Sequence, residues 1–352
     1  MGTLRALTYG SVLLLIAGWV LHVGESVLVP AVLGAGIVYV IVGLAYVLER
    51  LPVVGARLPL RLRYLISVTL IGLAFFMLAY LIMANKERAL ALAPQYQESL
   101  LASIQRMAVY FGIEREPTWS SLRADVLERI SLQRIFSSML ASVGSIVVTF
   151  IVVFLYAAFL LVEHRGFDAK MANLSDDPKR VARIREVMQA INRRIGSYLA
   201  LKTLLSVLLG AVSWVVMALW GLEFALLWAV LAGFLNFVPY IGSVLGVVFP
   251  VLMAIVQFGE PGTVLALLLA LTATQFLIGN FLDPYVMGSS LNLSPFAILL
   301  SLAVWSELWG VPGAFLAVPI TAAMTIMFSE FPGTRPHPLI SGFLKACQAK
   351  VA

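Results

Sequence analysis

The chain has 352 residues, of which 61% are hydrophobic and only 12% are charged, and its mean hydropathy is +0.98. Soluble domains carry about 25% charged residues, so this composition excludes a soluble protein and predicts an integral membrane protein. The net charge of +6 is typical of basic cytoplasmic loops, and no basic stretch lies beside an aromatic platform that would bind nucleic acid. A single cysteine excludes an intrachain disulfide, and the three histidines are far apart in sequence. We therefore expect no metal site, no cofactor and no enzyme active site.

Three apolar runs in the segment 1–84 predict membrane-spanning helices, at residues 7–22, 27–48 and 64–84. The loop between the second and third runs is strongly basic. It holds one acid, Glu49, against Arg50, Arg57, Arg61 and Arg63. By the positive-inside rule, this loop and the N-terminus are expected in the cytoplasm.

Residues 85–138 form a separate module whose acidic and basic residues nearly balance. Apolar residues at helical spacing predict two amphipathic helices outside the cytoplasm, packed on the membrane part or on a neighbouring subunit. A lid that captures a ligand is the alternative interpretation. Residues 139–162 predict a fourth span that returns to the cytoplasm, and residues 163–197 predict a basic cytoplasmic linker that contains a helix.

The second half is predicted to contain a transmembrane transport core, residues 198–330, and a cytoplasmic tail, residues 331–352. Four apolar segments in the core predict further membrane elements, at residues 198–220, 223–257, 263–282 and 296–328. The fold class predicted is therefore all-α: a polytopic membrane protein with about eight transmembrane helices and a small helical extracytoplasmic module.

Two of these segments are interrupted in their middle by proline and glycine. The interruptions contain Asn236, Pro239, Tyr240 and Gly242 in one segment and Pro312 and Gly313 in the other. Irregular backbone at membrane depth is tolerated only where it is buried in protein or lines a watery cavity, and broken helices recur at transport sites. We interpret both interruptions as parts of a transport path, with a structural proline kink as the alternative. An internal repeat and a chance similarity of the two segments remain equally open.

Polar residues inside apolar segments are the other candidates for a transport site, because they are costly in a membrane. The amides of Asn236, Gln275 and Asn280 suit a polyhydroxylated solute or a partly dehydrated cation, although amides also join helices in bundles. A proton-coupled carrier needs a carboxylate that changes its protonation state. Asp283 and Glu307 are the best candidates for such ion coupling.

Four motifs in the second half resemble those of the autoinducer-2 exporter (AI-2E) family of bacterial permeases. They are NFVPYIGS from Asn236, GNFLDPYVMG from Gly279, LSP from Leu293 and WGVPGAFLAVP from Trp309. The resemblance covers nearly the whole chain, and the first half matches mainly in its layout. It implies a multi-pass permease of the inner membrane that exports a small molecule as a homo-oligomer, with a pentamer as the favoured assembly.

The leading functional hypothesis is thus a secondary-active transporter that exports a small polar solute, such as the quorum-sensing signal autoinducer-2, with coupling to H+ or Na+. No phosphate-binding glycine loop is present in the sequence, so ATP is not expected to drive transport directly. The alternatives are a Na+/H+ antiporter and a non-transporting membrane scaffold. Both termini are expected in the cytoplasm.

Overall fold

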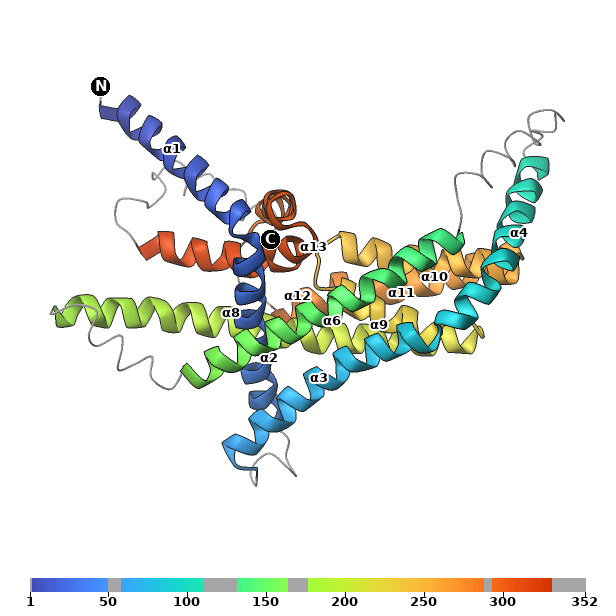
Figure 1. Ribbon diagram of the computed structural model, residues 1–352, viewed down its shortest axis with the longest axis horizontal. Helices are drawn as coiled ribbons and strands as arrows, with labels where there is room; N and C mark the ends of the chain where they lie inside the picture. The colour runs from blue at the N-terminus through green and yellow to red at the C-terminus, as the bar shows by residue number, and fades with distance from the viewer. Residues whose placement is uncertain (1, 50–57, 111–131, 164–176, 288–292, 331–352) are drawn as a thin grey trace. The chain divides into compact units, whose positions relative to one another are not determined.

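The computed structural model describes residues 2–49, 58–110, 132–163, 177–287 and 293–330 (Figure 1). Every regular element in these ranges is a helix, and no strand occurs within them. Six of the described helical stretches are long and apolar enough to cross a membrane. The prediction of an all-α, multi-pass membrane protein is therefore confirmed.

The described helices of the first half overlap the four predicted spans and the first helix of the 85–138 module. They are α1 (Gly2–Val23), α2 (Glu25–Glu49), α3 (Leu60–Ala84), α4 (Lys86–Tyr110) and α6 (Leu132–Glu163). The amphipathic helix expected first in the 85–138 module is α4, whereas the second one falls outside the described residues. The linker helix and the fifth span, which the sequence separated, form one continuous helix of 42 residues, α8 (Pro178–Leu219).

The described chain divides into two compact units. One comprises Met1–Glu25, Phe159–Leu199 and Ser289–Ala352, and we call it unit 1. The other comprises Ser26–Ala158 and Ala200–Gly288, and we call it unit 2. The predicted domain boundaries, which follow the chain rather than these units, stay predictions.

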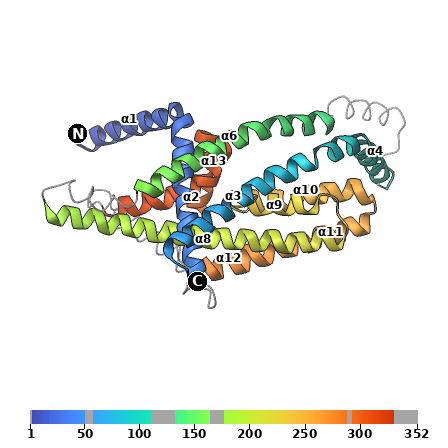
Figure 2. The same ribbon diagram turned by 60° about the horizontal axis from the view of Figure 1, so that its bottom comes forward.

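In unit 2 the interrupted segment 223–257 forms two helices, α9 (Ala225–Leu235) and α10 (Ile241–Phe258), that pack against each other. Their contacts run in antiparallel register. The rings of Trp228 and Phe249 lie 6.2 Å apart, and Ala232 lies against Gly246. In the last turn of α10, far from the connection to α9, Gln257 bonds to Gly221 and Glu223, which precede α9. The segment therefore turns back on itself instead of continuing in one direction through the interruption (Figure 2).

The turn between the two helices follows from three residues. Pro239 has no N–H to continue α9, and Tyr240 adopts a φ of 61°, a conformation that L side chains rarely adopt. Gly242 lies directly on the carbonyl oxygen of Leu235, where a Cβ atom would clash. The turn closes with backbone bonds from Val238 to Leu235 (2.9 Å) and from Gly242 to Val238 (2.9 Å). These internal bonds satisfy backbone N–H and carbonyl groups for which lipid tails offer no hydrogen-bond partner.

Three further helices complete the C-terminal part of unit 2: α11 (Pro261–Phe276), the π-helix η3 (Leu277–Leu282) and α12 (Asp283–Met287). Helices α4 and α11 both pack on α10 (Figure 1). The apolar core between these helices includes the fully buried Met217, Ala254 and Leu267. Helices α8 and α9 approach closely at Gly210 and Gly233, where an added Cβ atom would lie 3.1 Å from the Ala229 carbonyl oxygen and 3.0 Å from the Ser206 carbonyl oxygen, respectively.

In unit 1 the helix α13 (Pro295–Glu330) contains the second interruption. Its backbone leaves helical geometry at Trp309 and at Gly310, which has a φ of 59°. The Trp305 indole N–H donates to Thr321 Oγ1 over 3.2 Å. Sixteen residues of straight helix would span about 24 Å, so the chain reverses here too. The Trp309 indole donates to the Leu21 carbonyl oxygen of α1 (2.9 Å), which holds this second turn.

Candidate functional site

Four polar side chains meet at the turn between α9 and α10. The Lys202 ammonium of α8 lies 2.8 Å from Asp283 Oδ2 and 3.5 Å from Asn236 Oδ1. The Asn236 amide in turn donates to Ser206 Oγ over 3.0 Å. We call these four residues the turn cluster; they come from α8, from the end of α9 and from the start of α12.

The position of Asp283 depends on the π-helix that precedes it. Pro284 has no N–H to donate to Asn280, and a proline ring clashes with the carbonyl group four residues before it. The chain relieves this clash by widening into η3, where the Asp283 N–H reaches back five residues to the Ile278 carbonyl oxygen. Such π-helical turns re-aim side chains and are frequent at functional sites.

Three side chains of the turn cluster are buried, and the fourth, Asp283, exposes 19% of its side chain. Lys202 and Asn236 expose only 6% and 7% of their surface, and Ser206 exposes 4%. Helix α10, which begins at the turn, is long and apolar enough to cross a membrane. A lone charge among such apolar helices is strongly disfavoured. The Lys202–Asp283 ion pair makes the cluster electrically neutral and so allows both charges to remain.

One atom of the cluster is left without a partner. Asp283 Oδ2 accepts from Lys202, but Asp283 Oδ1 is buried and has no hydrogen-bond partner among the described residues. A buried carboxylate oxygen ordinarily accepts at least one hydrogen bond. The cluster can therefore accept a hydrogen bond from a solute hydroxyl or ammonium group, or bind a cation, at this oxygen.

The structure brings together some of the residues predicted from the sequence. Asn236 and Asp283 meet in the turn cluster, and Pro239, Tyr240 and Gly242 form the adjacent turn. Gln275 is half-buried on α11, and Asn280 is exposed on η3. In unit 1, Pro312 and the buried Gly313 follow the reversal of α13, and Glu307 is exposed just before it.

Sequence reasoning missed Lys202 and Ser206. Both residues lie inside the span predicted at 198–220, and a lysine within an apolar segment is a signal that could have identified this position.

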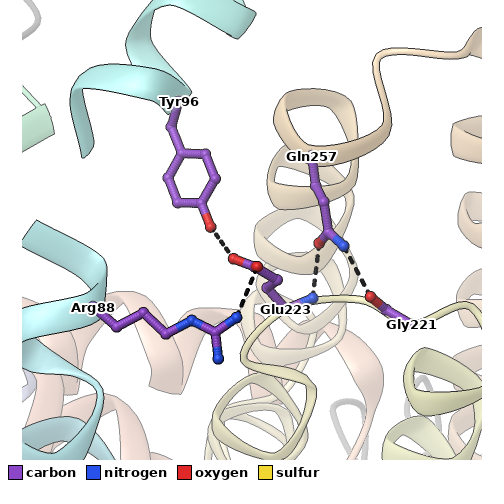
Figure 3. Close-up of polar contacts among 5 residues, drawn as sticks. All are labelled: Arg88, Tyr96, Gly221, Glu223 and Gln257. Atoms are coloured by element: carbon purple, nitrogen blue, oxygen red, sulfur yellow. Dashed lines mark hydrogen bonds and ion pairs between the residues drawn. The ribbon is translucent and has the colours of Figure 1, made fainter. Parts of the chain in front are cut away.

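A second polar cluster lies at the opposite end of α10 from the turn (Figure 3). The Glu223 carboxylate accepts a hydrogen bond from the Tyr96 hydroxyl and pairs with Arg88 at 2.9 Å, both on α4. The Glu223 N–H donates to Gln257 Oε1 (2.7 Å), and the Gln257 amide donates to the Gly221 carbonyl oxygen (2.8 Å). These contacts attach α4 to the ends of the α9–α10 hairpin. Burial, followed by the hydrogen bond to Glu223, raises the pKa of the Tyr96 hydroxyl well above its ordinary value.

Curated proteins with similar sequences are transport proteins by name. The chain is 30% identical over 289 residues to the AI-2 transport protein TqsA of Escherichia coli (strain K12), a match covering 79% of each chain. It is 30% identical over 296 residues to YhhT of the same strain, which is named as a candidate transport protein, over 82% of this chain and 81% of that one. A Borreliella burgdorferi protein named in the same way is 35% identical over 197 residues, and this chain covers about half of its length (53%).

The model of the AI-2E family of transporters matches residues 9–333, which include the turn cluster, both chain reversals and the Glu223 contacts. This match extends far beyond the motifs of the second half and includes the helices of the first half. The chain therefore belongs to the AI-2E transporter family.

Proposed function

We propose that this protein is a secondary-active transporter that exports a small, polar, uncharged solute, and that the turn cluster is its transport site. The observation that carries the proposal is the buried, neutral Lys202–Asp283 pair at the α9–α10 turn, with Asp283 Oδ1 unpaired in the described part of the chain. Hydrogen-bond donors and acceptors at one neutral site suit a solute with several hydroxyl groups. Autoinducer-2 is the first solute to test, because TqsA is named for its transport.

The α9–α10 turn is a suitable place for the conformational change that transport requires. Because the chain reverses at this turn, a change in the tilt of the α9–α10 hairpin can open the cluster toward one side of the membrane. Coupling to H+ or Na+ through Asp283, and through Glu307 in unit 1, is part of the proposal. The predicted transport path also includes Pro239, Tyr240, Gly242, Gln275, Asn280, Pro312 and Gly313.

The location and assembly follow the sequence-based expectations. We propose a bacterial inner or plasma membrane, with both termini and the arginine-rich segment 49–63 in the cytoplasm. A homo-oligomer, with a pentamer favoured, is likewise proposed from the family resemblance. Reaction of single introduced cysteines with an impermeant reagent on intact cells would test this orientation.

The experiment that tests the function measures autoinducer-2 outside and inside cells that express the protein. Asp283→Asn is expected to reduce export by about tenfold, because the loss of a charged hydrogen-bond partner costs about 1.5–3 kcal/mol. Glu260→Gln is the matched control, since this exposed carboxylate bonds only to Thr263 in the neighbouring turn. Equal export by the wild type, both variants and cells that lack the protein would contradict the proposal and favour a scaffold.

A Na+/H+ antiporter would be distinguished in everted vesicles. Addition of sodium would then dissipate a preformed proton gradient, as reported by acridine orange, in the absence of any organic solute. Asp283→Asn should abolish this response if the same carboxylate carries the ion.

A further inference from the structure

The Lys202 ammonium occupies a position that resembles a site for a small cation. Two oxygen atoms from different elements face it, Asp283 Oδ2 at 2.8 Å and Asn236 Oδ1 at 3.5 Å. Carboxylate and amide oxygens are the donors that hard metal cations prefer. The ammonium group therefore takes the place that a dehydrated monovalent cation could take between the same atoms.

The surroundings hold these oxygens in place whether or not the ammonium is present. The Asn236 amide nitrogen donates to Ser206 Oγ at 3.0 Å, so the amide oxygen, and not the nitrogen, is turned toward Lys202. Asp283 is held by the π-helical backbone bond to Ile278. Asp283 Oδ1, which has no partner among the described residues, offers a further donor atom to a bound ion.

The side chain of Lys202 has the most rotatable bonds of any in this arrangement. Lysine has a flexible four-carbon stem and a compact charge, and no other described oxygen lies within bonding distance of its ammonium group. Withdrawal of the ammonium would leave the Asp283 carboxylate unpaired in apolar surroundings, where either a second cation or a proton must take its place.

We propose that Asp283 and Asn236 form a monovalent-cation site, and that Lys202 occupies it as a tethered cation with which Na+ competes. This inference rests on the proposed transport site and names its ionic partner: exchange of the Lys202 ammonium for an inorganic cation is the step that links ion binding to movement of the turn. Lys202 thus determines how strongly the site depends on external cations.

The test uses the full-length protein in detergent and does not depend on the transported solute. Thermal unfolding is followed in sodium chloride and in choline chloride at equal ionic strength. Lys202→Gln removes the tethered cation, so sodium should stabilise this variant specifically. When sodium is at ten times its dissociation constant, the folding equilibrium should shift by about tenfold relative to choline.

The matched control is the double variant Lys202→Gln/Asp283→Asn, which removes both charges and keeps the shapes of the side chains. It should fold and respond equally to the two salts. Asn236→Asp provides a second route, because it adds a negative charge while Lys202 remains, and it should also gain a sodium-specific stabilisation.

Three results would overturn the proposal: equal midpoints of Lys202→Gln in the two salts, failure of this variant to fold in sodium while the double variant folds, or an equal sodium response in the double variant. Failure of autoinducer-2 export with a preserved sodium response would instead count against the proposed solute and leave the cation site standing.

Discussion

The indole nitrogen of Trp305 lies 3.2 Å from the hydroxyl oxygen of Thr321, although sixteen residues separate the two in one apolar segment. The same reversal occurs in unit 2, where the hydrophobic run from Ala225 to Phe258 folds into two antiparallel helices. In both units a buried glycine lies against a backbone carbonyl oxygen of the preceding helix: Gly242 on Leu235 and Gly313 on Trp305. The two interrupted segments thus share a packing geometry as well as proline and glycine, which favours the internal repeat that the sequence left open.

Removal of the Thr321 hydroxyl should destabilise the reversal in unit 1. Trp305 exposes only 8% of its surface, so Thr321→Val would leave a buried indole N–H without an acceptor. We expect a loss of about 1–3 kcal/mol, measured by thermal or denaturant unfolding in detergent. The control is Thr325→Val, whose exposed hydroxyl bonds only to its own helix. Equal stabilities of the two variants would show that the indole bond does not hold the reversal.

A side chain at position 242 should disrupt the turn in unit 2. A Cβ atom there would overlap the Leu235 carbonyl oxygen, which belongs to the backbone and cannot rotate away. Gly242→Ala should therefore destabilise the protein by about 1–3 kcal/mol and reduce export, because the turn carries Asn236. Gly262→Ala on α11 is the control, since an added Cβ meets nothing within 4 Å there. The measurements are the unfolding midpoint and autoinducer-2 export, and a normal midpoint for Gly242→Ala would contradict the observed packing.

The membrane spans could be predicted from composition, because apolar runs of about 20 residues have few alternatives to a transmembrane helix. The reversals could not. A proline and a glycine inside an apolar run are equally typical of a kinked span and of a hairpin, and the choice depends on the contact between Gly242 and Leu235. Hydropathy reports whether a segment prefers lipid, and it carries no information about the direction in which the chain leaves a turn.

The candidate site was predictable only in part, for a similar reason. Asn236 and Asp283 stand out in the sequence as polar residues in apolar surroundings, whereas nothing local identifies Lys202 as their joint partner. The pairing of Lys202 with Asp283 links residues 81 positions apart, and no local pattern specifies such a contact. The sequence contains the two motifs around Asn236 and Asp283. The structure adds α8, whose Lys202 contacts both residues.

The contact between α4 and Glu223 should depend on pH above the ordinary tyrosine range. Tyr96→Phe removes a hydrogen bond to a carboxylate, and a loss of about 1.5–3 kcal/mol is expected near pH 8. The raised pKa of Tyr96 means that, above about pH 10, the unfolded chain loses this proton while the folded protein keeps it. Stability contributed by the phenol is therefore complete below pH 10 and falls as the pH rises further.

The measurement is the difference in unfolding free energy between the wild type and Tyr96→Phe at pH 8 and at about pH 10.5, where the difference should be smaller. Tyr80→Phe, which alters an exposed tyrosine of α3, should show no such change. Arg88→Gln should cost less than Tyr96→Phe, about 0–1 kcal/mol, since 62% of the Arg88 side chain is exposed. A difference that stays constant with pH would refute the coupling between Tyr96 and Glu223.

The close approach of α8 and α9 should matter more for transport than for folding. A Cβ atom on Gly233 would lie 3.0 Å from the Ser206 carbonyl oxygen, so Gly233→Ala must move the two helices apart by a few tenths of an ångström. Asn236 follows Gly233 by three residues and would move away from Lys202, whose distance of 3.5 Å is already long. We expect a stability loss within about 1 kcal/mol and a larger proportional loss of autoinducer-2 export. Gly72→Ala on α3, where an added Cβ meets nothing within 4 Å, should leave both unchanged. If Gly233→Ala lowers stability but leaves export intact, the distance between Lys202 and Asn236 does not control transport, and the ion pair of Lys202 with Asp283 alone defines the site.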